Sequence, residues 1–306
     1  MGKRGNNNHQ NNDNQKRKKF KVSTGFLDPG TSGIYASCTR RKERLAAQEL
    51  GQLLEEKIEQ YYKEEIEELH SNSKDNTTGE TKDHEDSNKE QKVEDLSIEE
   101  QLKKELANMK KPQQSKTKDE KKKDILQLID LNCECMIFFK TRRPIVPEKF
   151  VKRIMEDLSD PNDKLKRTRY IQRLTPITNS CSASMEQMIK LANQILAPHF
   201  HEPNGRHDYK FSIELTRRNF NTIERNDIIN QIVALVCQNG KYQHQVDLKN
   251  YEKLIIVECF KNNIGMSVVG GDYLKKYKKY NIQSIFEAKF KDNKINDDKD
   301  INKTKN

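Results

Sequence analysis

The sequence predicts a mixed α+β and α/β protein with two folded units, and three observations support this prediction. Apolar residues recur at strand or helix spacing only in segments 20–70 and 124–271. Those segments alternate predicted strands with predicted helices, which is typical of sheets covered by helices. Only 33% of the 306 residues are hydrophobic, so the rest of the chain lacks the apolar surface that would offset the entropy cost of ordering it.

The first predicted unit covers residues 20–159. A Pro29-Gly30 turn precedes a short strand at 33–38, and a long helix follows from about residue 41 with leucines along one side. Apolar runs at 125–131 and 134–140 predict further strands. Pro147 opens a helix at 148–158, because proline is favoured in the first helical turn. The order of elements predicts a small α+β unit that is interrupted by an insert.

The second predicted unit covers residues 160–271 and begins with a strand at 169–175. Ser184 and Gln187 have the spacing of a capping box for the next helix, which we expect to end at Pro198. Alternating apolar residues predict a strand at 209–216, and a helix follows at 228–236. Two apolar runs at 253–260 and 264–269 predict a hairpin that turns at Asn262-Asn263.

Three charged segments are predicted to be largely disordered. Residues 1–19 carry six basic residues and one acid. Three interpretations of this basic arm stay open, namely a nuclear localisation signal, an RNA contact and a tail that only increases solubility. Residues 71–123 have seven apolar residues in 53; within them, 97–110 has the pattern of an amphipathic helix that docks on the protein itself or on a partner. The composition of residues 272–306 predicts a Lys-rich tail, with short helices between 273 and 286 and disorder beyond 290.

Composition excludes several classes of protein. No apolar run approaches the roughly 18 residues of a membrane span, and the start of the chain lacks the apolar stretch of a secretory signal. Six cysteines in a chain of this length favour a reducing compartment over a disulfide scaffold. The net charge of +10 favours an acidic partner such as nucleic acid.

Two basic clusters are candidate contacts for a phosphate backbone, with a solvated basic face as the alternative. Residues 164–173 contain no acid, and an extended segment at 169–174 would project their arginines to one side. The second cluster ends strand 209–216 and opens the next helix, where backbone N–H groups also favour phosphate. The candidate RNA-binding residues are Lys164, Lys166, Arg167, Arg169, Arg173, Arg217, Arg218 and Arg225.

Signatures of catalysis are missing from the sequence. The glycine-rich segment 28–33 lacks the Gly-Lys-Ser/Thr of a nucleotide loop, and there is no dinucleotide, zinc-protease or nucleophile-elbow motif. Cys133 and Cys135 with the histidines of 199–207 could supply zinc ligands, but their spacing favours core cysteines and loop histidines. We therefore expect no catalytic residue, no metal and no cofactor.

Several blocks of the sequence resemble the eukaryotic THUMP-domain family that assists tRNA cytidine acetylation. These blocks are GFLDPGTSGI at 25–34, CTRRKER at 38–44, RYIQRLTPI at 169–177, CSA at 181–183, VDL at 246–248, IIVE at 255–258 and GMSVV at 265–269. The likeness covers about 20–70 and 124–285. One departure is that Asn250-Tyr251 follows Val-x-Leu where many THUMP modules have a proline.

The resemblance implies a ferredoxin-like N-terminal unit packed on a THUMP domain. It also implies tRNA binding through the acceptor arm and its CCA end, and an adaptor that presents the D-arm of serine and leucine tRNAs to a separate RNA cytidine acetyltransferase. We expect a nuclear or nucleolar location, with the cytoplasm as a further site, and no membrane partner.

Two alternatives to the adaptor stay open. The first is a tRNA-modifying enzyme, which would need a catalytic domain of roughly 150 residues, whereas few residues follow 271. The second is an interaction scaffold that does not bind RNA.

Overall fold

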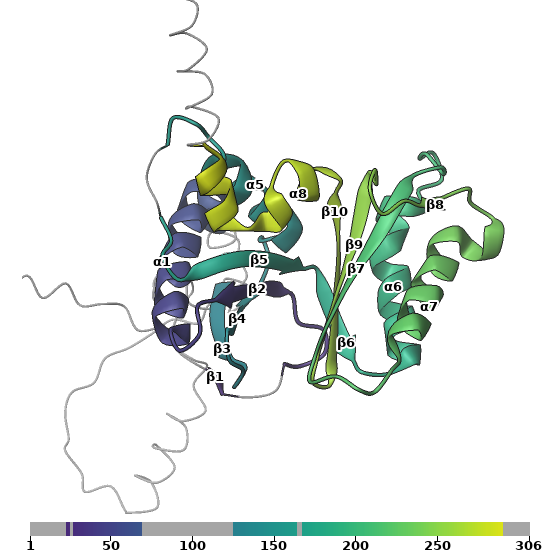
Figure 1. Ribbon diagram of the computed structural model, residues 1–306, viewed down its shortest axis with the longest axis horizontal. Coiled ribbons are helices and arrows are strands. Elements are labelled where there is room, and N and C mark those ends of the chain that lie inside the picture. The colour runs from purple at the N-terminus through teal and green to yellow at the C-terminus, as the bar shows by residue number, and fades with distance from the viewer. Residues whose placement is uncertain (1–22, 25–26, 69–124, 164–166, 290–306) are drawn as a thin grey trace, which may run out of the picture.

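A computed structural model of the protein describes residues 23–24, 27–68, 125–163 and 167–289. The predicted basic arm at 1–19, the insert at 71–123 with its helix at 97–110, and the tail beyond 290 lie outside the described residues. Figure 1 shows two units side by side, the first in purple, teal and yellow and the second in green. The predicted mixed architecture of sheets and helices is confirmed.

The first unit is a sheet with two helices on one face. Its elements are β1 (Ser23–Thr24), β2 (Gly33–Cys38), α1 (Glu43–Tyr61), β3 (Leu126–Asp130), β4 (Met136–Thr141), α5 (Pro147–Leu158) and β5 (Ile171–Ile177). The strand order is β1-β3-β4-β2-β5. From β2 to β5 the chain runs strand–helix–strand–strand–helix–strand, which is the ferredoxin-like motif. The predicted ferredoxin-like unit is therefore confirmed.

Strand β5 belongs to this first sheet, although the sequence grouped it with the second unit. It pairs antiparallel with β2, with Gly33 opposite Ile177. The fourth strand of a ferredoxin-like motif lies beside the first strand, and that pairing joins residues far apart in sequence. The first unit therefore extends to Ile177, beyond the boundary predicted at 159.

Side chains of the first sheet alternate between two buried clusters. On β2, Ile34 and Ala36 face α1 and α5, where Leu50, Leu54 and other helix residues complete the core. Tyr35 faces the opposite side and packs on Phe138, with ring centroids 4.6 Å apart. The same opposite-side cluster includes Phe260 of the second unit, so the two units share a core.

The second unit is a five-stranded sheet covered on one face by two helices. Its elements are β6 (Asn179–Ser182), α6 (Met185–Phe200), β7 (Lys210–Arg218), α7 (Arg225–Cys237), η1 (Gln238–Gly240), β8 (Gln245–Val246), β9 (Lys253–Phe260) and β10 (Asn263–Gly270). The strand order is β6-β10-β9-β7-β8. Helices α6 and α7 lie to the right of this sheet in Figure 1.

Strand β9 is buried on both faces and couples the two units. Ile255 and Val257 face the cluster formed with α6 and α7. Leu254 and Ile256 face the core of the first unit. The predicted hairpin of β9 and β10 is confirmed, but its turn is Lys261-Asn262, because Asn263 already pairs with Phe260.

The segment after β10 folds back onto the first unit. It contains α8 (Asp272–Lys275), η2 (Lys278–Tyr280) and a helical stretch at 282–289, which confirms the predicted short helices. Tyr273, Tyr277 and Tyr280 are almost fully buried in the first core. The described part of the predicted Lys-rich tail is therefore a structural element of the first unit.

Two local predictions concern helix α6. Its N-terminus has the predicted cap, because the Ser184 hydroxyl accepts the N–H of Gln187. The predicted end at Pro198 was wrong, since the helix continues to Phe200. A proline near the C-terminus of a helix removes one hydrogen bond, and the burial of Phe200 at 1% exposure offsets that loss.

The predicted turn before β2 joins the two units. Gly30 has a φ of 77°, which glycine adopts without the steric cost that other residues bear, and Pro29 precedes it. The Gly30 N–H donates to the Ser180 carbonyl of β6 at 2.7 Å.

Candidate RNA interface

The structure describes six of the predicted RNA-binding residues, namely Arg167, Arg169, Arg173, Arg217, Arg218 and Arg225, whereas Lys164 and Lys166 lie outside the described residues. Strand β5 begins at Ile171, so Arg167 and Arg169 precede it and only Arg173 lies within it. The prediction that these three arginines project from one side of a strand was therefore wrong.

The segment before β5 is held by a carboxylate instead of a neighbouring strand. Glu49 of α1 accepts the backbone N–H groups of Arg169, Tyr170 and Ile171 at 2.8, 3.1 and 3.3 Å. A carboxylate that accepts several N–H groups fixes the backbone more firmly than a neutral acceptor does. Glu49 thereby sets the position of Arg169.

The three arginines near β5 differ in their ion-pair partners. Arg167 pairs with Glu56 at 2.6 Å and with Asp163 at 3.3 Å. Arg173 lies 3.6 Å from Glu214 of β7 and so links the two units. Arg169 is exposed and has no carboxylate partner among the described residues. Of the three, Arg169 has the charge most available to a phosphate.

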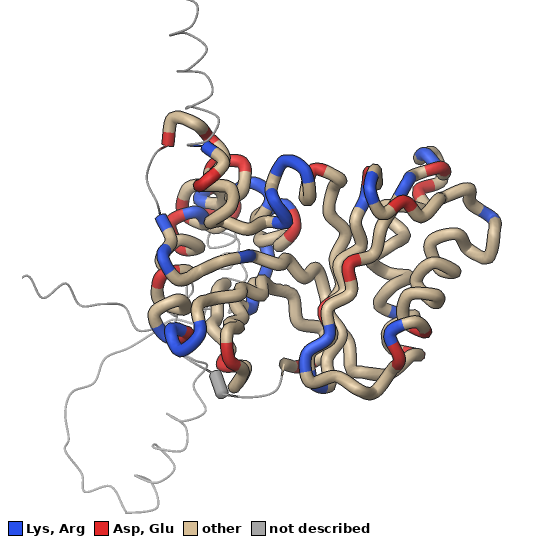
Figure 2. Tube along the Cα trace, viewed as in Figure 1, with Lys and Arg blue, Asp and Glu red and all other residues tan. Residues whose placement is uncertain are grey.

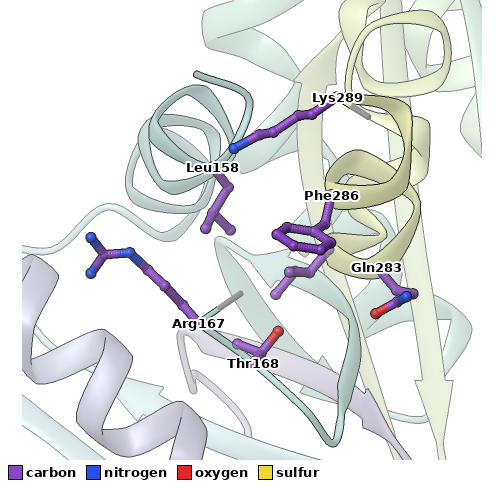
Figure 3. A pocket seen from close by; sticks show the side chains of 7 residues that line it. Leu158, Arg167, Thr168, Gln283, Phe286 and Lys289 are labelled. Atoms are coloured by element: carbon purple, nitrogen blue, oxygen red, sulfur yellow. The ribbon is translucent and has the colours of Figure 1, made fainter. Parts of the chain in front are cut away.

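Arg167 and Lys289 border a small hollow beside the C-terminal helix (Figure 3). Figure 3 shows Arg167 extending away from this hollow, while Leu158 and Phe286 line it. Its volume is about 10 Å³, room for one water molecule at most. The hollow is therefore too small to receive a nucleobase.

The second predicted cluster lies on β7 and at the start of α7, and two of its three guanidinium groups make hydrogen bonds within the chain. Arg217 donates to the Phe220 carbonyl at 2.9 Å. Arg225 is the first residue of α7, as predicted, and donates to the Leu215 carbonyl at 2.9 Å. The buried Nε of Arg218 has no partner among the described residues. The role of these arginines in RNA binding stays a prediction.

Arg218 belongs to a charged cluster at the junction of the two units. The Glu258 carboxyl of β9 is buried, and burial raises its pKa to about 7, although a hydrogen bond from Thr216 and the charge of Arg218 oppose the shift. Glu214 pairs with Lys279 at 3.0 Å as well as with Arg173. This cluster is a structural connection between β5, β7 and η2.

Sequence reasoning missed a basic group at the entry to α1. Arg41, Lys42 and Arg44 are exposed, and none of them has a carboxylate within ion-pair distance among the residues that the structure describes. Figure 2 shows the blue positions gathered at this end of α1. The sequence has four basic residues at positions 40–44, within a block of the family resemblance and at the start of a predicted helix, but neither pattern shows that three of the charges lack a carboxylate partner.

The backbone holds this loop beside Arg169. The Thr39 N–H donates to the Tyr170 carbonyl at 2.9 Å. Arg41 has a φ of 60°, a left-handed conformation that is uncommon for a residue with a side chain. The Glu43 carboxylate turns toward the backbone and accepts the Cys135 N–H at 2.9 Å. This hydrogen bond is the main reason that the pKa of the Glu43 carboxyl is lowered.

We call Arg41, Lys42, Arg44 and Arg169 the basic surface. Its four side chains come from two segments that the β2–β5 pairing brings together. A fifth residue, Arg40, pairs with Glu134 at 3.0 Å, but both side chains are about two-thirds exposed, so the pair adds little stability and can open. The basic surface is suited to a phosphate backbone.

Cysteine and histidine side chains are used inside the fold. Burial raises the pKa of the Cys38 and Cys259 thiols to about 12 and that of Cys181 to about 11. His201 lies 3.0 Å from the Val236 carbonyl and stacks on Tyr242. Within the described ranges, no group of three or more potential metal ligands comes together.

Among the helices that the structure describes, none has the length and the apolar character of a membrane span.

Comparison with known proteins places this architecture in a family. The chain is 57% identical to the protein named tRNA acetyltransferase TAN1 of Saccharomyces cerevisiae, over 95% of this chain and 97% of that protein. The chain belongs to the THUMP-domain family of TAN1. It is 29% identical to human THUMP domain-containing protein 1 over 86% of this chain and 66% of that protein.

The THUMP-domain model matches residues 182–269, which is the second unit from the end of β6 to β10. The solved THUMP domain of THUMP domain-containing protein 1 is 31% identical and covers 28% of this chain and 85% of that chain, with a TM-score of 0.25. Arg217, Arg218 and Arg225 lie inside the THUMP range, whereas the basic surface lies on the ferredoxin-like unit. The family is one of tRNA binding and tRNA acetylation, as the resemblance implied.

Proposed function

We propose that the chain is a tRNA-binding adaptor that presents serine and leucine tRNAs to a separate RNA cytidine acetyltransferase, which acetylates a cytidine in the D-arm. The observation that carries this proposal is the basic surface. Four cations without carboxylate partners in the described structure stand on a frame fixed by Glu49 and by the Thr39–Tyr170 bond. Such a surface can hold a phosphate backbone, and it contains no group suited to acyl transfer.

The chemistry of the buried residues supports a non-catalytic role. Acyl transfer through cysteine needs a thiolate with a lowered pKa, and the pKa values of Cys38, Cys181 and Cys259 are raised by burial. The Glu258 carboxyl, with its pKa near 7, is buried between the two units instead of facing a cleft. We therefore propose that the bond-making residues belong to the partner enzyme.

The alternative is that this chain is itself the acetyltransferase. The printed name of the yeast relative, tRNA acetyltransferase TAN1, favours this alternative. A scaffold that does not bind RNA is a weaker alternative, because the basic surface would then have no ligand.

The experiment that tests the proposal is nucleoside mass spectrometry of tRNA from cells that lack the gene. We expect acetylcytidine to disappear from serine and leucine tRNAs and to return when the wild-type chain is expressed. Expression of a chain with Arg41→Glu, Lys42→Glu and Arg169→Glu should restore much less. Unchanged acetylcytidine in the deletion strain would refute the proposed function.

The location in the cell follows from the same proposal. We propose a nuclear or nucleolar location, where tRNA precursors are modified, with the cytoplasm as a further site. The support is the run of basic residues at 16–19, which has the composition of a nuclear localisation signal. Imaging of a fluorescent fusion with and without residues 1–19 tests this assignment.

A further inference from the structure

An apolar patch lies at the edge of the second sheet, away from the basic surface. Leu248 is 71% exposed and Val246 is 51% exposed, which makes them the two most exposed large hydrophobic residues in the described ranges. An open groove of about 220 Å³ lies beside them, lined by Leu215, Tyr251 and Leu274 among others. Apolar surface of this kind next to a groove is typical of an interaction site.

The turn that carries Leu248 is held firmly by hydrogen bonds. One Asp247 carboxylate oxygen accepts the N–H groups of Lys249 and Asn250 at 2.9 and 2.8 Å. These two bonds lower the pKa of the Asp247 carboxyl. The Asp247 N–H in turn donates to the Phe211 carbonyl of β7 at 2.8 Å. The turn therefore presents Leu248 to solvent in a fixed position instead of allowing it to fold inward.

Positive charge gathers at and beside the groove. Arg225 and Lys279 line it. Lys249, Lys275 and Lys278 follow or precede lining residues in the chain and have no carboxylate partner in the described part of the chain, and Lys275 donates to the Asn250 side chain at 3.0 Å. Carboxylates on the rim are already paired, because Glu214 lies 3.0 Å from a lysine and Asp247 lies 3.8 Å from another. Figure 2 shows blue positions around α8. The rim therefore favours an acidic ligand.

The exposed apolar side chains favour protein over RNA as that ligand. Unstacked nucleobases are bound mainly by aromatic rings and by arginine planes. Tyr251 and Arg225 also line the groove, but Tyr251 is half-buried and Arg225 donates to the Leu215 carbonyl. The most exposed apolar side chains, Val246 and Leu248, are aliphatic. Aliphatic side chains gain free energy by contact with other aliphatic side chains.

We propose that this surface binds an acidic segment of a protein partner whose aliphatic side chains cover Leu248 and enter the groove. We call it the β8 patch and define it by Val246, Leu248, Lys249, Tyr251, Leu274 and Lys275. Carboxylates of the bound segment face Lys249 and Lys275. The inference does not depend on the basic surface, because β8 pairs with the start of β7 and lies apart from that surface. Arg225, one of the predicted RNA contacts, lines the groove, so the test below includes RNA as an outcome.

Site-specific photo-crosslinking of the full-length chain in cells of its source organism tests the inference. A photoreactive amino acid in place of Leu248 should give adducts to a partner protein, and the adduct peptide should contain more Asp and Glu than Lys and Arg. The same amino acid in place of Leu45, which is 43% exposed elsewhere, is the matched control and should not give that adduct. The double variant Lys249→Glu with Lys275→Glu should lower the adduct yield about tenfold, equivalent to about 1.4 kcal/mol.

Five outcomes would overturn the inference. They are adducts mainly to RNA, adducts mainly to a second copy of the chain, an adduct peptide without acidic excess, a yield unchanged by the two charge reversals, and the absence of any adduct at position 248. Leu248→Ser should leave the thermal unfolding midpoint and the affinity for tRNA unchanged, because the side chain is exposed, and a loss of tRNA affinity would assign the patch to RNA instead.

Discussion

Charge reversal on the basic surface should change how tRNA affinity responds to salt. Each phosphate contact that is lost flattens the slope of log K against log salt by roughly 0.7–0.9. Arg41→Glu, Lys42→Glu and Arg169→Glu together remove three cations that have no carboxylate partner among the described residues. The triple variant should therefore have a slope flatter by roughly 2–3. Filter binding of tRNA across a series of salt concentrations measures this slope directly.

A matched control separates a local contact from the effect of net charge. Lys190 is also exposed, but it pairs with Glu186 at 2.6 Å on α6, on the far side of the second sheet. Lys190→Glu changes the net charge as much as Arg41→Glu does, and we expect it to leave the slope within experimental error. If the triple variant has the wild-type slope, or if Lys190→Glu flattens the slope as much as Arg41→Glu, the basic surface is not the RNA contact.

Three further predictions concern the frame of that surface and the charged groups buried within the fold. Glu49→Ala should weaken tRNA binding and lower the unfolding midpoint, because it leaves three backbone N–H groups without their acceptor. Glu49→Gln keeps an acceptor oxygen and should have smaller effects on both, as measured by a binding curve and a thermal melt. Lys57 is 5% exposed, and its ammonium lies 2.6 Å from the Asp157 carboxylate. Asp157→Ala should therefore lower the free energy of unfolding in urea by about 3–5 kcal/mol, because it leaves a buried charge unpaired. Lys57→Met should lower it less, and equal losses would contradict this reasoning. Burial raises the pKa of Glu258 from 4.5 to about 7 in the folded state. Between these two pH values the folded state binds more protons than the unfolded state does, so the contribution of Glu258 to the free energy of unfolding falls as the pH rises from about 4.5 to 7. The difference in unfolding free energy between wild type and Glu258→Gln should follow that window, and a difference that does not vary with pH would refute the assignment.

Local patterns predicted most elements because these are encoded in neighbouring residues. The hairpin of β9 and β10 and the capped start of α6 each depend on contacts within a few residues. Strand β5 was predicted as a strand but assigned to the wrong sheet, because its alternation contains no information about which distant strand it pairs with. The extension of α6 past Pro198 depends on the burial of Phe200, which is a tertiary contact.

The C-terminal segment shows how composition can hide a core element. Tyr273, Tyr277 and Tyr280 have helical spacing, but the surrounding lysines led to the prediction of a tail. Their burial in the first core depends on the path of the chain after β10, which no local pattern specifies.

The candidate site was predicted only in part for the same reason. Arg169 was identified from the sequence, and it lies on the basic surface. Its neighbours Arg41, Lys42 and Arg44 are more than 120 positions away in the chain, and only the pairing of β2 with β5 and the Thr39–Tyr170 bond bring them together. Conversely, the sequence could not show that Arg217 and Arg225 donate to backbone carbonyls.

In the proposed function, this chain holds tRNA while another protein forms the acetyl bond. Purified chain, serine tRNA and acetyl-CoA, with and without the RNA cytidine acetyltransferase, provide the most direct measurement, with acetylcytidine quantified by mass spectrometry. We expect no product with the chain alone, and more product from the enzyme when the wild-type chain is added than when the triple basic-surface variant is added. Acetylcytidine formed by the chain alone would show that the chain is itself the acetyltransferase.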